Sequence, residues 1–174
     1  MRFEEVQVMP KAWTLVSILP GVALIIGVLA EGASAVRVPL SVVIIAVGAT
    51  LLFGSWFRSI RLITVVGADT INLRYRGLLK TRTIPIPSVR SAEARTYKPL
   101  REYGGWGIKY GPKGWVYNVS GKEGVQLKLE NAKPLLIGSG RANELVEAIT
   151  SSPAYRAGGS GRRPPALSYF DLKN

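Results

Sequence analysis

Two long stretches without any ionisable side chain constrain this chain more than any other feature. They cover residues 13–30 (WTLVSILPGVALIIGVLA) and residues 38–57 (VPLSVVIIAVGATLLFGSWF). About 20 residues of apolar helix cross the hydrocarbon core of a membrane, where the backbone finds no other hydrogen-bond partners. A buried core helix and a cleaved signal peptide are the alternatives, but the first 11 residues carry two glutamates and a second apolar run follows at once. The pattern predicts a two-helix transmembrane hairpin.

Small residues recur at helical spacing within both apolar runs. They are Ala23 and Gly27 in the first run, and Ala46, Thr50 and Gly54 in the second. Small residues let helices approach closely in lipid. These faces are therefore candidates for packing on each other or on a helix of another protein.

The basic residues around the apolar runs indicate an orientation. Arg37 is the one basic residue between the runs, whereas Arg58 and Arg61 follow the second run and Arg2 and Lys11 precede the first. Cytoplasmic flanks are enriched in Lys and Arg. We therefore expect a multi-pass membrane protein with both termini in the cytoplasm.

The net charge is concentrated after the second run. Three basic and three acidic residues precede Arg58, so the whole formal charge of +12 belongs to residues 58–174. An anionic membrane surface attracts each nearby Lys or Arg by about 1 kcal/mol. Nucleic acid would attract the same charge. The chain has no cysteine, which agrees with a reducing compartment.

Residues 58–150 have the pattern of a small β-rich domain. Short segments alternate apolar and polar residues with period two, and Gly, Pro and Asp separate them. Residues 139–150 instead place Leu145, Val146 and Ile149 at helical spacing behind Ser139, a candidate N-cap. We expect an all-β barrel of about seven strands, capped by one C-terminal α-helix. The expected parts are a cytoplasmic segment (1–12), the hairpin (13–57), the barrel domain (58–150) and a linker with a docking tail (151–174).

This order of elements resembles the bacterial pleckstrin-homology-like (PH-like) proteins of unknown function. The segments GGWGIKYGPKGWVYNVSGKEGVQLKL and LLIGSGRANELVEAI are similar to the glycine-rich and helix-opening patterns of that family. Residues 3–7 (FEEVQ) are similar to the acidic, glutamine-containing start of its membrane-bound members. The resemblance implies a PH-like fold at the bacterial inner membrane. It implies no reaction, because the family shares no catalytic residues.

The residue types present argue against catalysis and against cofactor or metal binding. Without histidine, neither Ser120 nor Ser139 has the base of a Ser-His-Asp triad, and without Cys or His an ordinary zinc or haem site is not expected. Residues 104–107 and 138–140 are glycine-rich, yet neither completes a phosphate-loop or dinucleotide motif. The second stretch opens the predicted helix, so it is either a capping turn or an anion site beside Arg141.

Basic and aromatic residues after residue 95 are candidates for binding a polyanion. The candidates for an anionic surface are Lys98, Arg101, Lys109 and Lys113. Three aromatic residues could stack on nucleic-acid bases, namely Tyr110, Trp115 and Tyr117. A small barrel needs large side chains inside, so we expect these aromatics in the core and do not expect nucleic acid as a partner.

The end of the chain changes from a linker to an apolar segment. Residues 151–165 (SSPAYRAGGSGRRPP) have linker composition, and the candidate docking residues that follow are Leu167, Tyr169, Phe170 and Leu172. The sequence thus predicts a non-catalytic, membrane-anchored accessory or scaffold subunit. Its expected partners are other integral membrane subunits and anionic lipid of the inner leaflet. The alternative is an anionic-lipid or small-anion binding module at the cytoplasmic membrane face.

Overall fold

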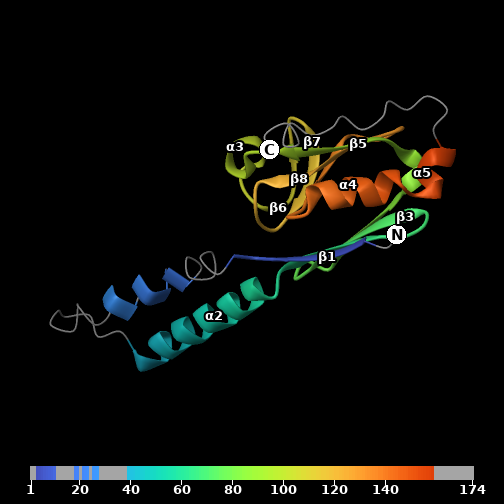
Figure 1. Ribbon diagram of the computed structural model, residues 1–174. Coiled ribbons are helices and arrows are strands. Elements are labelled where there is room, and N and C mark those ends of the chain that lie inside the picture. Colours follow the sequence, from blue (N-terminus) through green and yellow to red (C-terminus); the bar gives the residue numbers. More distant parts are fainter. Residues whose placement is uncertain (1–2, 11–17, 20, 24, 28–38, 159–174) are drawn as a thin grey trace, which may run out of the picture. The chain divides into compact units, whose positions relative to one another are not determined.

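The computed structural model describes residues 3–10, 18–19, 21–23, 25–27 and 39–158 (Figure 1). The chain divides into two compact units. One consists of Met9–Ile60, and the other combines Met1–Val8 with Arg61–Asn174. The second unit is thus built from two pieces of sequence, and the first is inserted between them.

The inserted unit contains the helix α2 (Leu40–Arg58). Pro39 precedes α2, where its missing N–H costs nothing. At the other end, the backbone N–H of Ser59 donates to the carbonyl groups of Ser55 and Trp56, and that of Ile60 donates to Phe57. Most of its large apolar side chains are exposed, including Ile44, Leu52 and Phe53. Among the described residues, α2 is the one helix long and apolar enough to cross a membrane.

The prediction of a two-helix transmembrane hairpin is wrong. Within residues 13–30 the structure describes residues 18–19, 21–23 and 25–27, all of them helical. Among the described residues, α2 alone is long and apolar enough to cross a membrane. This run contains Pro20, Gly21 and Gly27, and proline and glycine are the two residues least favourable to a helix. Hydropathy alone therefore predicted one span more than the described residues contain.

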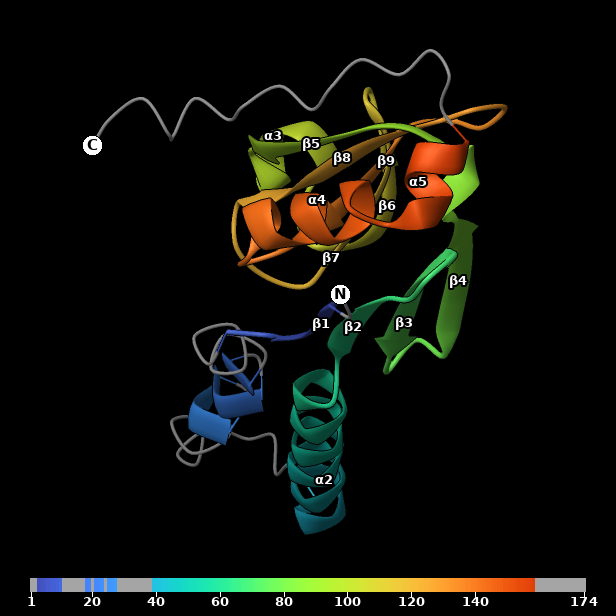
Figure 2. The same cartoon turned by 45° about the vertical axis from the view of Figure 1, so that its right-hand side comes forward.

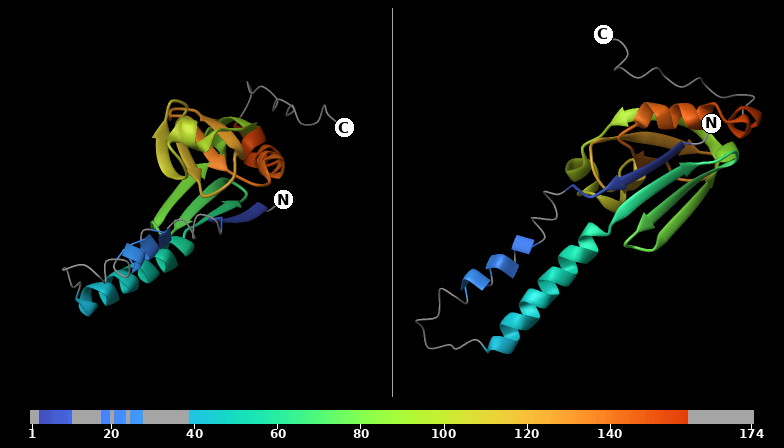
Figure 3. Two further views of the ribbon diagram at one scale, coloured as in Figure 1. Left: turned by 90° about the vertical axis from the view of Figure 1, so that its left-hand side faces the viewer. Right: turned by 60° about the horizontal axis from the view of Figure 1, so that its bottom comes forward.

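The other unit begins with a four-stranded antiparallel sheet in the order β1-β2-β3-β4. Its strands are β1 (Phe3–Val8), β2 (Arg61–Val66), β3 (Thr70–Arg76) and β4 (Lys80–Pro85). The alternation predicted from sequence is visible in β3, where Ile71, Leu73 and Tyr75 are buried. Figure 3 shows β1 beside β2, and Val8 is opposite Arg61 in their register.

A second sheet of five strands has the order β5-β8-β9-β7-β6. Its strands are β5 (Val89–Thr96), β6 (Gly107–Gly111), β7 (Gly114–Asn118), β8 (Glu123–Leu129) and β9 (Leu135–Gly138). The β7–β9 pair is parallel and the other pairs are antiparallel. A single seven-stranded barrel is therefore also wrong, since the described residues form nine strands in two sheets. Strand β1 comes from the segment before the apolar runs, where the sequence pattern predicted no strand.

Short helices complete this unit. They are η2 (Ile86–Ser88, a 3-10 turn), α3 (Pro99–Tyr103), α4 (Ala142–Thr150) and α5 (Pro153–Ala157). The predicted C-terminal helix corresponds to α4, which buries Leu145 and Ile149 and contacts β5, β8, β1 and β2 (Figure 2). A single capping helix is wrong, because α3 follows β5 and α5 follows α4. Gly104 ends α3 with a left-handed φ of 67°, a conformation that glycine adopts readily.

Candidate functional site

The four predicted anion-binding residues lie on α3 and on the β6–β7 hairpin. Lys98 immediately precedes α3, and Arg101 is in its last turn. Lys109 is on β6, and Lys113 is in the turn between β6 and β7. Helix α3 contacts β6, so the fold brings the four residues into one region. We call Lys98, Arg101, Lys109 and Lys113 the basic surface.

The members of the basic surface differ in how far they are already engaged. The Nζ atom of Lys109 donates to the carbonyl oxygen of Gly104 at 2.6 Å, and the Nζ atom of Lys113 lies 3.6 Å from a carboxylate oxygen of Glu102. Lys98 and Arg101 are exposed, and their side chains make no hydrogen bond or ion pair with the described residues. These two cations are therefore available to an external anion.

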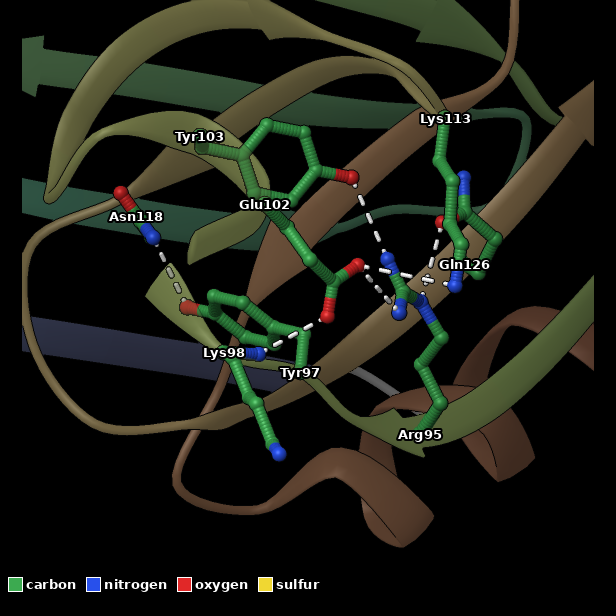
Figure 4. Close-up of polar contacts among 8 residues, drawn as sticks. All are labelled: Arg95, Tyr97, Lys98, Glu102, Tyr103, Lys113, Asn118 and Gln126. Carbon is green, nitrogen blue, oxygen red and sulfur yellow. Dashed lines mark hydrogen bonds and ion pairs between the residues drawn. The ribbon is translucent and has the colours of Figure 1, made fainter. Parts of the chain in front are cut away.

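A polar network centred on Glu102 holds α3 on the sheet (Figure 4). One carboxylate oxygen of Glu102 accepts the backbone N–H of Lys98 at 2.9 Å, and the other accepts Nη1 of Arg95 at 3.0 Å. The remaining donors of Arg95 reach Gln126 Oε1 at 3.1 Å and the Tyr103 hydroxyl at 3.2 Å. The side chains of Arg95 and Glu102 are 20% and 22% exposed. Arg95 is thus fully used inside the protein and is not a free anion-binding group.

The environment of Glu102 keeps its carboxylate charged. Burial raises the pKa of Glu102, but the backbone N–H of Lys98 and the side chain of Arg95 lower it by more, so the net shift is downward from the ordinary value. Burial also raises the pKa values of Tyr97 and Tyr103. At neutral pH the network therefore contains a carboxylate, a guanidinium and two neutral phenols.

Beneath the network, Asn118 connects three elements of the fold. It is completely buried, and its Nδ2 donates to the hydroxyl of Tyr97 at 2.9 Å while its Oδ1 accepts the backbone N–H of Gly107 at 2.8 Å. The backbone carbonyl oxygen of Asn118 accepts a hydrogen bond from the hydroxyl of Tyr75 at 3.1 Å. The sequence reading did not assign this role to Asn118, because a polar residue in an alternating strand normally indicates the solvent face.

The prediction that the three aromatics lie in the core is wrong for two of them. Tyr117 is buried, but Tyr110 is 54% and Trp115 is 38% exposed. These two face each other near the end of the β6–β7 hairpin, with ring centroids 5.4 Å apart. The Nζ atom of Lys133 lies 4.6 Å from the Tyr110 ring centroid and donates to its hydroxyl. The pair packs on its own hairpin rather than in the core.

The turn before α4 already holds a carboxylate from the same chain. Glu5 of β1 accepts the Ser139 hydroxyl at 2.5 Å and the backbone N–H of Gly140 at 2.8 Å. Arg141 donates to the carbonyl oxygen of Glu4 and lies over the ring of Phe3, 4.7 Å from its centroid. The sequence left open a capping turn or an anion site here, and the structure has a turn whose anion is Glu5.

The small residues of the apolar runs have mixed positions. Gly54 is buried, and a Cβ atom added to it would lie 3.3 Å from Ile18. A Cβ atom added to Gly21 would collide with Thr50, so the face of α2 with Thr50 and Gly54 contacts the first run of the same chain. The hydroxyl of Thr50 donates to the carbonyl oxygen of Ala46 at 2.8 Å.

The remaining small residues of the first run do not make this contact. Ala23 is exposed, and a Cβ atom on Gly27 would meet nothing within 4 Å. The contact instead uses Gly21, which the spacing argument had not selected.

The predicted linker is partly helical, because α5 lies within residues 151–165 and buries Tyr155. The predicted docking residues Leu167, Tyr169, Phe170 and Leu172 lie outside the described part of the chain.

Comparison with models of protein families found no family that matches the chain, and comparison with curated proteins found no similar protein. Among the described residues there is no group of three or more acidic, His or Cys side chains that could hold a metal ion. The chemistry that the site offers is ionic and hydrogen-bonding recognition through Lys98 and Arg101.

Proposed function

We propose that this protein is a non-catalytic, membrane-anchored module whose basic surface binds anionic groups at the membrane. The observation that carries the proposal is the pair of exposed, unengaged cations, Lys98 and Arg101, beside Lys109 and Lys113 on one region of the fold. Glu102, the nearby acid, pairs with Arg95 and Lys113, so it leaves the charges of Lys98 and Arg101 unpaired. A phospholipid headgroup is the anion closest to a domain tethered by an apolar helix.

We further propose that α2 is the membrane anchor and that β1 and β2 lie together on the cytoplasmic side. Two residues separate the end of α2 at Arg58 from the start of β2 at Arg61, and basic residues mark the cytoplasmic flank of a span. Val8 pairs with Arg61, so residues 9–60 leave and re-enter the sheet at adjacent positions.

A vesicle-binding experiment tests the basic surface. A fragment starting at Arg58 would lack β1 and Glu5, so the soluble form should instead join Val8 to Arg61 by an Asn-Gly turn, which suits two adjacent antiparallel strands. Its far-ultraviolet circular dichroism should first establish that the form is folded. We expect binding to vesicles with phosphatidylglycerol, weaker binding at high salt, and none to phosphatidylcholine vesicles.

The double variant Lys98→Ala and Arg101→Ala should weaken this binding about 30-fold, since each basic residue near an anionic surface contributes about 1 kcal/mol. The matched control removes two exposed cations from the other sheet, Arg74 and Arg76. Equal losses from both pairs would show that net charge alone drives binding, and the basic surface would be rejected.

An accessory role in a larger membrane assembly is the second candidate function. It is supported by the exposed apolar face of α2, where Phe53 packs its ring against Trp56 and Phe57 but leaves half of its own surface open. Purification in mild detergent followed by mass spectrometry tests this role. Recovery of the chain without other membrane proteins would reject it.

A further inference from the structure

Among the described residues, one outer strand of the five-stranded sheet has no partner on its outer side. Strand β5 is the outer strand, with β8 as its one neighbour in the sheet. The backbone N–H of Tyr97 donates to the carbonyl oxygen of Lys122 at 2.8 Å, and this bond fixes the phase of the antiparallel ladder. Hydrogen-bonded pairs alternate with non-bonded pairs along such a ladder. In the register of β5 and β8, the backbone groups of Ala92, Ala94 and Thr96 therefore point away from β8, toward the free edge.

A cavity of about 370 Å³ lies beside this free edge. Ala94 and Thr96 line it from β5, and Gly140 to Glu144 line it from the first turn of α4. Among the described residues, the outward N–H groups of Ala94 and Thr96 have no hydrogen-bond partner. Ala94 and Ala142 contribute methyl groups to the wall, and the other lining side chains include those of Arg95, Glu123 and Glu144. An open strand edge beside a cavity is the arrangement that accepts an extended peptide as an added strand.

The chain itself supplies a suitable segment at the right distance. Helix α5 contacts η2, which directly precedes β5, so the described chain ends at Gly158 near the start of β5. Leu167 comes nine residues after Gly158, which corresponds to a reach of about 30 Å for extended chain. The eight residues of β5 are about 26 Å long. The segment from Leu167 onward can therefore lie along β5 and extend to the cavity at its far end.

The composition of this segment agrees with the same placement. Pro164 and Pro165 cannot donate hydrogen bonds to a ladder, so pairing can begin only after them. The apolar residues from Leu167 to Leu172 follow immediately. We propose that residues 167–172, which lie outside the described part, add to the free edge of β5 as a short parallel strand and place an apolar side chain in the cavity next to α4. This surface is separate from the basic surface, and the inference does not depend on the proposed function.

Amide hydrogen exchange of the full chain in detergent tests the proposal. The amides of Ala94 and Thr96 should exchange at least 10-fold faster in a chain that ends at Gly158 than in the full chain. The amide of Trp115, which is bonded to the carbonyl oxygen of Pro134 away from the cavity, is the internal control and should exchange equally in both chains. A peptide of residues 166–174, added to the shortened chain, should restore the protection in a saturable way.

A full-length variant carrying Leu167→Asp and Phe170→Asp should behave like the shortened chain. Equal exchange of Ala94 and Thr96 in the full and shortened chains would overturn the proposal. Protection that rises with protein concentration would also overturn it, because the segment would then come from a second copy. The fold-loss of vesicle binding caused by the Lys98→Ala and Arg101→Ala double variant should be the same in the full and the shortened chain. A failure of the basic surface and a failure of the added strand are therefore recognised separately.

Discussion

Replacing Asn118 by alanine should be among the most destabilising single changes in this chain. The substitution removes the donor to the Tyr97 hydroxyl and the acceptor for the Gly107 N–H. Tyr97 is 2% exposed, so water does not easily replace the lost partner. Each buried polar group left without a partner costs about 1–3 kcal/mol. Because Gly107 is only half-buried, we expect a total loss of about 3 kcal/mol, a large part of the roughly 5–15 kcal/mol that stabilises a typical domain.

Urea unfolding of the full chain in detergent, followed by tryptophan fluorescence, measures this loss. Asn131→Ala is the matched control, since Asn131 is exposed in a turn and should change the free energy of unfolding by less than about 0.5 kcal/mol. Tyr97→Phe removes the other partner of the buried bond. The double variant with Asn118→Ala should then be less destabilised than the sum of the single variants, with a coupling of about 0.5–3 kcal/mol. Strict additivity would refute the reasoning.

Three further outcomes are expected. Glu5→Ala should lower the free energy of unfolding by about 1–2 kcal/mol, because the turn before α4 loses its hydrogen-bond acceptor. Glu4→Ala should not, because Arg141 bonds the backbone oxygen of Glu4 and not its side chain. The same urea titration compares the two variants. Glu102→Gln should destabilise the protein at pH 7, and the difference in the free energy of unfolding should shrink as the pH falls below the ordinary carboxyl pKa. The pKa of Glu102 is depressed in the folded state, so its stabilisation is present above the ordinary carboxyl pKa and is lost as the pH falls through the folded value. Burial raises the pKa of Tyr75 to about 12. The free energy of unfolding should therefore fall as the pH rises from 10 to 12, because the unfolded state loses this proton first. Titration of absorbance at 295 nm should show one phenol that ionises late, and Tyr75→Phe should remove it.

The sequence predicted local structure better than it predicted pairing. The period-two segments at 70–76 and 125–129 lie within β3 and β8, and the apolar stripe at 145–149 lies within α4. These patterns depend on which face of an element is buried, and that is a local property. Which strands become neighbours depends on contacts far apart in the chain. The parallel pairing of β7 with β9, and the use of residues 3–8 as a fourth strand beside β2, leave no such local signal.

The candidate site shows the same division between local and distant information. Charge and turn composition selected Lys98 and Lys113, which the fold does bring into one region. The role of Asn118 depends on α3 covering the outer face of the sheet, where the Tyr97, Tyr103, Val116 and Leu136 side chains form a small separate core. Alternation alone assigns that face to solvent. Trp115 is instead more exposed than the pattern predicts, because it lies next to the tip of the β6–β7 hairpin, where less of the chain covers it.

The pairing of β1 with β2 requires the chain to close a loop over the inserted residues 9–60. Loop closure costs entropy, although each doubling of loop length adds only about 0.6 kcal/mol. The closure is offset by contacts that β1 makes outside its own sheet, through Glu5 to Ser139 and Gly140 and through Phe3 to Arg141. These contacts tie the first strand to the last long helix of the unit. The inserted residues 9–60 are therefore joined at both ends to neighbouring strands of one sheet. A chain that lacks residues 1–8 would lose an edge strand and also the carboxylate of Glu5 at the start of α4.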